Sequence, residues 1–324
     1  MRRVSFFSDV ERDLVVATRT PLADGVLALD LVSHNGRDLP AWTPGSHVDV
    51  LLAPGVERQY SLCGDLHDRS RWRIAVLRED AGRGGSVRLH EEVVVGQRLR
   101  VRGPRNHFAF EVTPGTRYRF VAGGIGITAL RAMVATAEAA GADWTLDYAG
   151  RSRATMAFVA ELTAAHPDRV TVHAADEGAR LDVRALLAQP RSDTAVYVCG
   201  PTRLIDAVEE TLADWPPAAL HAERFEAREF GEPVWPDPFE VELALSGTTV
   251  VFEPGQSVLD AVAAEGVVVL SSCRVGTCGT CETPVLEGAV EHRDSVLTPA
   301  EQAEDVVMMV CVSRAAGPRL VLDL

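Results

Sequence analysis

The amino-acid sequence predicts a multidomain protein with a β-rich first domain, a second domain built on a parallel α/β sheet, and a smaller third domain. Residues 1–113 contain short runs of alternating apolar side chains, which are typical of an antiparallel barrel or sandwich. Residues 114–225 alternate such runs with helical stretches, which is the pattern of a parallel α/β sheet. Residues 226–238 are rich in proline and acidic side chains and form a stiff predicted linker to the third domain, residues 239–324.

The composition is that of a globular protein with an acidic surface. Hydrophobic residues make up 47% of the 324 residues, and the formal net charge of −14 argues against a nucleic-acid partner. The sequence contains no lysine, so arginine, backbone N–H groups or hydroxyls must bind any anionic cofactor. The net charges of residues 1–113, 114–238 and 239–324 are +1, −6 and −9. The acidic third segment serves either solubility or docking of a basic partner.

The apolar stretches and the cysteines indicate a cytoplasmic protein. The apolar run near Met1 is too short for the core of a signal peptide, and no stretch approaches the roughly 20 apolar residues of a membrane span. Because the cytoplasm keeps thiols reduced, the six cysteines predict metal ligation or burial rather than disulfides. We expect a monomer that does not bind a membrane.

Short predicted strands fill the first domain, separated by turn signals such as Pro44-Gly45. A glycine-rich turn then leads into a predicted short helix at Val87–Glu91. The predicted strands are Leu14–Thr18, Val26–Val32, Val48–Leu52, Tyr60–Cys63, Trp72–Leu77 and Arg98–Arg102.

Strands and helices alternate in the second domain, and a hairpin and a helix open the third. The predicted strands of the second domain are Arg117–Ala122, Trp144–Ala149, Val170–Ala174 and Ala195–Cys199. Its predicted helices are Ala129–Ala140, Met156–Ala165, Val183–Ala188 and Arg203–Asp214. The third domain begins with a predicted hairpin of Phe239–Leu245 and Thr249–Glu253, followed by a helix at Ser257–Glu265.

Four cysteines near the chain end have the spacing Cys-x4-Cys-x2-Cys-x29-Cys, namely Cys273, Cys278, Cys281 and Cys311. Three thiolates from one tight loop and one from a distant segment are the plant-type arrangement of a [2Fe–2S] ferredoxin, in which each iron takes two protein sulfurs. Gly276 and Gly279 suit a loop that must wrap a cluster. The spacing therefore predicts a β-grasp ferredoxin domain, against the alternative of a zinc site.

Two stretches of the first domain suit a flavin. Arg58, Tyr60 and Ser61 lie on one predicted strand, where arginine pairs with a phosphate or carbonyl, tyrosine stacks on a ring and serine bonds a ring edge. Downstream, Gly82-Arg83-Gly84-Gly85-Ser86 runs into a predicted helix, whose free N–H groups favour a phosphate. Taken alone, each stretch could equally be an ordinary strand or an ordinary turn.

The second domain carries the signal of a dinucleotide site. A glycine-rich turn after the first strand opens a helix, where the backbone can approach a pyrophosphate; its residues are Gly123, Gly124, Gly126, Ile127 and Thr128. Cys199-Gly200-Pro201 ends the last strand, at the edge where ligands sit in open α/β sheets. Arg151 and Arg153 suit the 2′-phosphate of NADP, whereas Asp176-Glu177 suits an unphosphorylated ribose.

The order of these motifs resembles the phthalate dioxygenase reductase family over about residues 8–324. The resemblance implies a flavin-binding antiparallel β-barrel, a Rossmann-like NAD-binding domain and a ferredoxin domain, with FMN rather than FAD and with NADH as cosubstrate. It implies that Arg58, Tyr60 and Ser61 contact the flavin, that Gly84, Gly85 and Ser86 hold its phosphate, and that the backbone at Ala75–Leu77 lines its ring. It also places Phe225 beside that ring, although the residue could instead pack in a core. Ala129 departs from the proline that the family often has after its glycine turn.

This resemblance implies an electron-transfer reductase without a catalytic dyad, because hydride transfer needs alignment more than an acid or a base. The cluster would pass single electrons to a separate terminal oxygenase, expected to be a Rieske non-haem iron oxygenase or O-demethylase. Three alternatives remain: a haem-thiolate monooxygenase as acceptor, a stand-alone NADH:acceptor reductase, and a redox sensor that uses the cluster as a switch.

Overall fold

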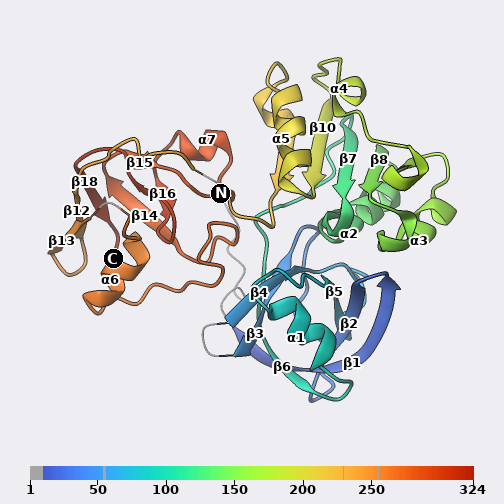
Figure 1. Cartoon of the computed structure of the whole chain (residues 1–324), viewed down its shortest axis with the longest axis horizontal. Coiled ribbons are helices and arrows are strands. Elements are labelled where there is room, and N and C mark those ends of the chain that lie inside the picture. The colour runs from blue at the N-terminus through green and yellow to red at the C-terminus, as the bar shows by residue number, and fades with distance from the viewer. Residues whose placement is uncertain (1–9, 54–55, 229, 254) are drawn as a thin grey trace. The chain divides into compact units, whose positions relative to one another are not determined.

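The computed structural model describes residues 10–53, 56–228, 230–253 and 255–324, so the prediction made from residues 1–9 lies outside the described part of the chain. The chain forms two compact units, Met1–Glu223 and Arg224–Leu324. Each unit is described by itself (Figure 1).

A six-stranded antiparallel sheet forms the first part of the N-terminal unit. The strands are β1 (Glu11–Ala23), β2 (Val26–Ser33), β3 (His47–Ala53), β4 (Val56–Ser61), β5 (Arg71–Leu77) and β6 (Arg98–Arg105), in the order β4-β3-β6-β1-β2-β5. Each of the six predicted strands overlaps an observed one, but the predicted Tyr60–Cys63 shares only Tyr60 and Ser61 with β4, which begins earlier, at Val56. A bridge between Leu62 and Ile74, with a 2.9 Å hydrogen bond from the Cys63 N–H to the Arg73 carbonyl, joins the two edge strands at one end. This contact curls the sheet toward the predicted barrel.

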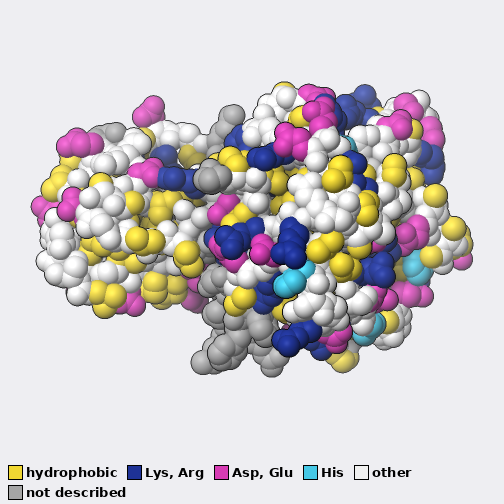
Figure 2. All heavy atoms as spheres, turned by 90° about the horizontal axis from the view of Figure 1, so that it is seen from below, with side chains coloured by type: hydrophobic (Ala, Val, Ile, Leu, Met, Phe, Trp, Pro, Cys, Tyr) yellow, Lys and Arg dark blue, Asp and Glu magenta, His cyan; other side chains and the backbone are white. Residues whose placement is uncertain are grey.

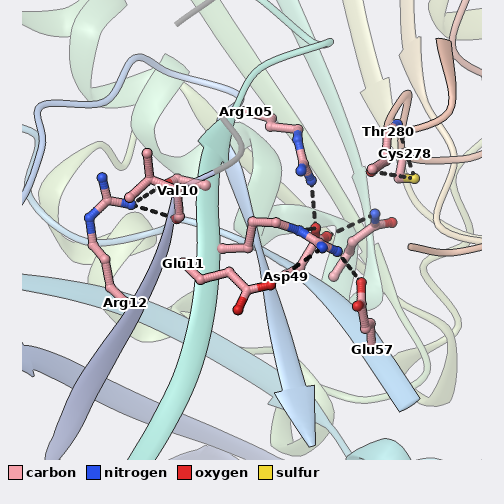
Figure 3. A network of polar contacts seen from close by, with 11 residues as sticks. Val10, Glu11, Arg12, Asp49, Glu57, Arg105, Cys278 and Thr280 are labelled. Carbon is pink, nitrogen blue, oxygen red and sulfur yellow. Dashed lines mark hydrogen bonds and ion pairs between the residues drawn. The ribbon is translucent and has the colours of Figure 1, made fainter. Parts of the chain in front are cut away.

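A buried ion cluster stands among β3, β4 and β6. Asp49 is fully buried and accepts hydrogen bonds from Arg105 and, at 3.2 Å, from Arg102 Nε; Arg102 also pairs with Glu57 (Figure 3). Burial raises the pKa of Asp49, but the charges of Arg105 and His47 and the hydrogen bonds from Arg105 and Gln59 outweigh it, and the net pKa is lowered. The carboxylate therefore stays charged inside the sheet and ties three strands together.

A parallel sheet forms the second part of the N-terminal unit. Its order is β11-β10-β7-β8-β9, and the strands are β7 (Arg117–Gly123), β8 (Asp143–Gly150), β9 (Val170–Ala174), β10 (Thr194–Cys199) and β11 (Leu220–Glu223). Two helices, α2 (Ile127–Ala139) and α3 (Val159–Ala165), share a core with one face of the sheet, and α4 (Val183–Leu186) and α5 (Thr202–Thr211) share a core with the other (Figure 1). The four predicted strands and four helices are present, with boundaries shifted by a few residues, whereas β11 was not predicted.

The two sheets of this unit share one hydrophobic core. Phe108 and Phe110 follow β6 and pack on Tyr197 of β10, with ring centroids 5.7 and 5.1 Å apart. Val26 and Ala75 of the barrel belong to the same buried cluster. The six-stranded sheet and the α/β part therefore form one compact body.

The C-terminal unit is a small mixed sheet with the order β13-β12-β18-β14-β16. Its elements are β12 (Phe239–Leu243), β13 (Thr248–Phe252), α6 (Val258–Ala264), β14 (Glu282–Glu287), β15 (Val290–Glu291), α7 (Pro299–Gln302), β16 (Val307–Met309), β17 (Arg314–Ala315) and β18 (Arg319–Leu322). The predicted hairpin and helix are confirmed, and the five strands from β14 onward were not predicted. Ser257 caps α6 by accepting a hydrogen bond from the Asp260 N–H.

The predicted linker has no helix or strand among its described residues, but it contacts the C-terminal unit. The Val234 N–H donates to Glu291 Oε2 at 3.0 Å, and Arg314 donates to the Trp235 carbonyl at 3.1 Å. Arg293 donates to the Gly231 carbonyl at 3.2 Å. The later half of this segment is therefore held by side chains of its own unit.

The surface carries both charges in the N-terminal unit, where Figure 2 shows arginine and carboxylate side chains interspersed on one face. Within the part of the chain that the structure describes, none of the helices is both long and apolar enough to span a bilayer.

Candidate cofactor sites

The flavin candidates converge where β4 meets the turn before α1 (Gly85–Glu91). Arg58 donates to the carbonyls of Glu57 and Arg83 at 2.8 and 2.7 Å, which holds its side chain against the glycine turn. A Cβ on Gly85 would lie 2.5 Å from Arg58 Cγ. The absence of a side chain at Gly85 therefore lets the arginine stem cross the start of the helix.

Arg58 keeps an unneutralised charge at this turn. Its hydrogen bonds go to carbonyls, and no carboxylate pairs with it among the described residues. Burial, and then the charge of Arg83, lowers the pKa of its guanidinium. A partly desolvated cation beside a glycine-rich turn suits an anionic group such as a phosphate. Gly84, with φ of 78°, precedes the helix in the left-handed conformation.

The other flavin candidates lie on β4, at the end of β5 and around the turn before α1. The Ser61 hydroxyl is buried and has no hydrogen-bond partner among the described residues, so it is free to bond a ligand edge. The Ser86 hydroxyl accepts from the Glu79 N–H at 3.0 Å. Tyr60 is half-buried, and burial raises the pKa of its phenol, which stays neutral. Ala75 and Leu77 lie at the end of β5, and Gly82 closes a turn onto the Glu79 carbonyl at 3.2 Å.

The dinucleotide candidates are brought together by glycine packing. A Cβ on Gly126 would lie 2.2 Å from the Cys199 carbonyl oxygen, and one on Gly200 would lie 2.8 Å from Gly123 Cα. A Cβ on Gly123 would in turn lie 2.6 Å from Pro201 Cδ. The ends of β7 and β10 therefore touch through bare backbone. Gly124 is different, because its φ is 52° and a Cβ there would meet open space.

Hydrogen bonds fix the turn at the start of α2. The buried Thr128 hydroxyl donates to the Ile125 carbonyl at 2.9 Å, and Ile127 is fully buried. The Tyr148 hydroxyl lies 3.1 Å from the carbonyl oxygens of both Gly124 and Ala157, so it can donate to either. The turn is thus held in shape before any ligand binds.

A buried carboxyl beside Cys199 was missed by the sequence reasoning. Glu223 pairs with Cys199 in the register of β10 and β11. Burial raises the pKa of Glu223 to about 8, and one of its oxygens has no hydrogen-bond partner among the described residues. Burial, and then the charge of Glu223, raises the pKa of the Cys199 thiol well above its usual range. The sequence did not predict the strand that buries Glu223, because β11 follows a Pro-Pro pair and has only four residues.

The ribose candidates lie after β8 and β9. The Asp176 N–H donates to the Arg151 carbonyl at 3.0 Å, so the two loops are adjacent. Arg153 pairs with Glu177 at 2.9 Å, whereas the exposed side chains of Arg151 and Asp176 have no ion-pair partner among the described residues. Arg151 and Asp176 are therefore both available to a ribose or its phosphate, and the choice between NADH and NADPH stays as the sequence left it.

The four cluster cysteines are buried and close together. Cys273 approaches Cys278 and Cys311 within hydrogen-bonding range, and Cys281 approaches Cys311. Among the described residues, no three His, Cys, Asp or Glu side chains converge on the position of a single metal ion. The four thiols thus approach one another in a chain, and four thiolates are the ligand set of a [2Fe–2S] cluster.

The loop around these cysteines places hydrogen-bonding groups next to their sulfur atoms. The N–H groups of Val275 and Thr277 donate to Cys273 Sγ at 3.4 Å, and the Thr280 hydroxyl lies 3.1 Å from Cys278 Sγ (Figure 3). Gly276 and Gly279 have φ of 73° and 71°, as the wrapped loop requires. The hydrogen bond to Cys273 and burial raise the pKa of Cys278, so iron must displace its proton.

Phe225 lies two residues beyond β11 and is 41% exposed. It falls in the C-terminal unit rather than at the end of the N-terminal one. Its exposure removes the alternative of simple core packing in the described structure, because a core aromatic would be buried.

Comparisons with known proteins agree with these sites. The 2Fe-2S iron-sulfur cluster binding domain family matches residues 241–316. A putative reductase subunit of a toluene-4-sulfonate monooxygenase system from Comamonas testosteroni is 43% identical over 96% of this chain and 98% of its own length. The crystal structure of phthalate dioxygenase reductase is 34% identical, with a TM-score of 0.68 over 98% of both chains. An intact type IV self-sufficient cytochrome P450 monooxygenase is 45% identical, with a TM-score of 0.91; all of this chain matches 43% of that one.

The fold and the sites define an oxidoreductase that uses NAD(H), a flavin and a [2Fe–2S] cluster. The chain belongs to the phthalate dioxygenase reductase family, as the order of its motifs predicted. It is thus an electron-transfer reductase of the kind that serves oxygenase systems.

Proposed function

We propose that this protein takes a hydride from NADH onto FMN and passes single electrons through its [2Fe–2S] cluster to a separate Rieske-type terminal oxygenase. The observation that carries the proposal is the shared core of the N-terminal unit, which holds Cys63, two residues beyond the flavin strand β4, in one buried cluster with Ile127 of the glycine turn. Hydride transfer depends on such alignment more than on an acid or a base.

The proposed FMN site uses the barrel. Arg58 supplies the positive charge for the phosphate, together with the turn of Gly82, Gly84, Gly85 and Ser86. Ser61 offers its unpartnered buried hydroxyl to the flavin ring. Tyr60 offers a neutral ring for stacking, and the backbone at Ala75–Leu77 lines the flavin.

The proposed NADH site uses the carboxyl edge of the parallel sheet. The turn from Gly123 to Thr128 receives the pyrophosphate, because Gly124 faces open space and its neighbours are fixed. Cys199, Gly200 and Pro201 flank the nicotinamide. Asp176 accepts from the ribose hydroxyls, and we favour NADH because Glu177 neutralises Arg153 and leaves Arg151 as the one arginine of this pair for a 2′-phosphate.

The cluster supplies one-electron chemistry on Cys273, Cys278, Cys281 and Cys311. We propose the domain division 1–113, 114–225, linker 226–238 and 239–324. A cytoplasmic location fits the six free cysteines, and we propose a monomer because one chain carries the candidate residues of all three sites.

A haem-thiolate monooxygenase is the second candidate acceptor. The match to an intact self-sufficient cytochrome P450 monooxygenase favours it, because that protein joins a similar chain to further sequence. The two candidates share every step up to the cluster and differ only in the acceptor.

The test begins with a visible spectrum of anaerobically purified protein. We expect flavin and [2Fe–2S] bands, with FMN released on denaturation; a spectrum without an iron–sulfur shoulder contradicts the proposal. Purified Rieske oxygenase and purified cytochrome P450 are then offered as acceptors with NADH, and the ratio of their reduction rates decides between the partners.

A cysteine variant separates the oxygenase reductase from a stand-alone NADH:acceptor reductase. Cys281→Ser removes one cluster ligand and should abolish reduction of the oxygenase while ferricyanide reduction by the flavin continues. If the oxygenase is still reduced at the parental rate, the cluster is not on the path. A rate of oxygenase reduction that falls with added salt supports docking through the acidic third segment.

A further inference from the structure

Arg131 connects the flavin strand to the α/β part of the N-terminal unit. It lies on α2, the helix that begins at the glycine turn, and Figure 1 shows α2 on the side of that part nearest the barrel. Its Nη1 donates to the Cys63 carbonyl at 2.6 Å. Cys63 is fully buried and stands two residues beyond Ser61, so this hydrogen bond reaches the end of the proposed flavin strand.

The other half of the guanidinium is held by α3. Nη2 donates to Glu161 Oε1 at 2.5 Å, and the guanidinium carbon lies 4.9 Å from the ring centroid of Phe158. Phe158 has a φ of 61°, an uncommon conformation for a bulky residue. The two terminal nitrogens are therefore both engaged, and an aromatic face lies beneath the planar group, whereas Nε is buried without a hydrogen-bond partner among the described residues. The two hydrogen bonds and the ring leave the group little freedom to move.

A continuous path of contacts leads on from Phe158 to the glycine turn. Ala157, its neighbour in the chain, offers its carbonyl to the Tyr148 hydroxyl, which is equally close to the Gly124 carbonyl. A second hydrogen bond joins the two parts nearby, from the Asp24 N–H to the Ala154 carbonyl at 2.7 Å. Arg131 thus lies between the residues proposed to hold flavin and those proposed to hold the nucleotide.

We propose that Arg131 is a positioning residue that sets the distance between the flavin strand and the nucleotide turn, and with it the rate of hydride transfer. The inference rests on the proposed function. Arg131 does not touch either cofactor in this scheme; it acts by fixing the Cys63 carbonyl against α2. A misplacement of about 1 Å between reacting groups can cost on the order of 100-fold in rate.

Arg169 provides a matched control. Its guanidinium carbon lies 5.4 Å from the Trp144 ring centroid, and it donates to the carbonyls of Ala142 and Trp144 at 3.2 and 3.3 Å. It also approaches Glu138 at 4.0 Å. It therefore makes the same three kinds of contact as Arg131, but all of them lie within the α/β part.

The experiment compares Arg131→Met, Arg131→Lys and Arg169→Met in the full holoprotein. Methionine keeps a stem on Phe158 but removes the donors, so we expect flavin reduction at saturating NADH to slow by about 10- to 100-fold. The apparent Kd for NADH should change less than about three-fold, because Arg131 lies outside the nucleotide site. Lysine can still donate to one carbonyl and should recover part of the rate, and Arg169→Met should remain within about two-fold of the parent.

Hydrogen exchange provides a readout that does not depend on activity. Arg131→Met should speed amide exchange in residues 61–65 and 158–162, and Arg169→Met should leave residues 61–65 unchanged. A parent chain whose flavin is not reduced by NADH overturns the proposed function and the inference with it. An active parent with equal rates in both methionine variants, or with unchanged exchange in residues 61–65, overturns the positioning role alone.

Discussion

Replacing Gly126 by alanine tests whether the contact between the two strand ends shapes the nucleotide site. Gly126 has a φ of −59°, which any residue adopts, so backbone strain does not require glycine here. The requirement is steric. An added Cβ would lie 2.2 Å from the Cys199 carbonyl oxygen and 2.7 Å from the Gly200 nitrogen. Restoring an unstrained contact of about 3.5 Å demands a shift of about 1.3 Å between β10 and the turn.

A shift of this size moves the nicotinamide relative to the flavin. The expected loss is about 100-fold in the rate of flavin reduction, with weaker NADH binding as well. The measurement is anaerobic stopped-flow reduction of the bound flavin over a range of NADH concentrations. Gly200→Ala should have a smaller effect of the same kind, because its Cβ would lie 2.8 Å from its nearest neighbour, Gly123 Cα.

Gly231→Ala is the control, since a Cβ there meets nothing within 4 Å. The spectrum of the [2Fe–2S] cluster and the thermal unfolding of the C-terminal unit should be unchanged in all three variants. A parental rate of flavin reduction in a correctly folded Gly126→Ala protein would refute the steric reasoning. A lower flavin content with a parental rate of reduction per bound flavin would place the glycine contact outside the nucleotide site.

Three further changes test the interior of each unit. Thr280→Val removes the hydroxyl next to a cluster sulfur and should lower the reduction potential of the cluster in a redox titration, whereas Thr280→Ser should keep a potential close to that of the parent. An unchanged potential in Thr280→Val would contradict a hydrogen bond from this hydroxyl to the sulfur. Asp49→Asn removes the buried charge that Arg105 and Arg102 share, although Arg102 keeps Glu57. It should cost about 3 kcal/mol in denaturant unfolding, and a loss below about 1 kcal/mol would contradict this role. Burial lowers the pKa of His292, but Asp294 and Asp305 outweigh it, and the net pKa is raised. Protonated His292 therefore stabilises the C-terminal unit below the unfolded-state pKa of about 6.5, and this stabilisation is lost as the pH rises through the folded-state pKa. The thermal unfolding temperature at about pH 6 should therefore differ from that at about pH 8 in the parent but not in His292→Gln.

Local patterns explain what the sequence predicted. The cysteine spacing and the glycines of the cluster loop reflect local requirements, because ligands and left-handed turns must occur at fixed positions along the chain. Alternating apolar residues likewise located the barrel strands, since one face of each is buried. These features depend on a few neighbouring residues, so they can be predicted without knowing the distant contacts.

Distant contacts explain what the sequence could not predict. The strands β14 to β18 have two to six residues each, and their pairing partners lie far along the chain. β14 contains a proline and charged residues, which weaken the strand pattern. Glu223 was missed for the same reason, because its burial depends on β10 and not on its neighbours in sequence.

The contacts of Gly126 and Arg131 show how the two kinds of information combine. The motif located the glycine turn, but only the structure shows that Gly126 is required by the Cys199 carbonyl whereas Gly124 is required by its φ of 52°. Nothing in the sequence distinguishes Arg131 from the other 31 arginines. Its importance arises because Cys63, 68 positions earlier, presents a carbonyl to it. A motif therefore identifies the residues that meet a cofactor, and long-range contacts determine how far apart two cofactors are held.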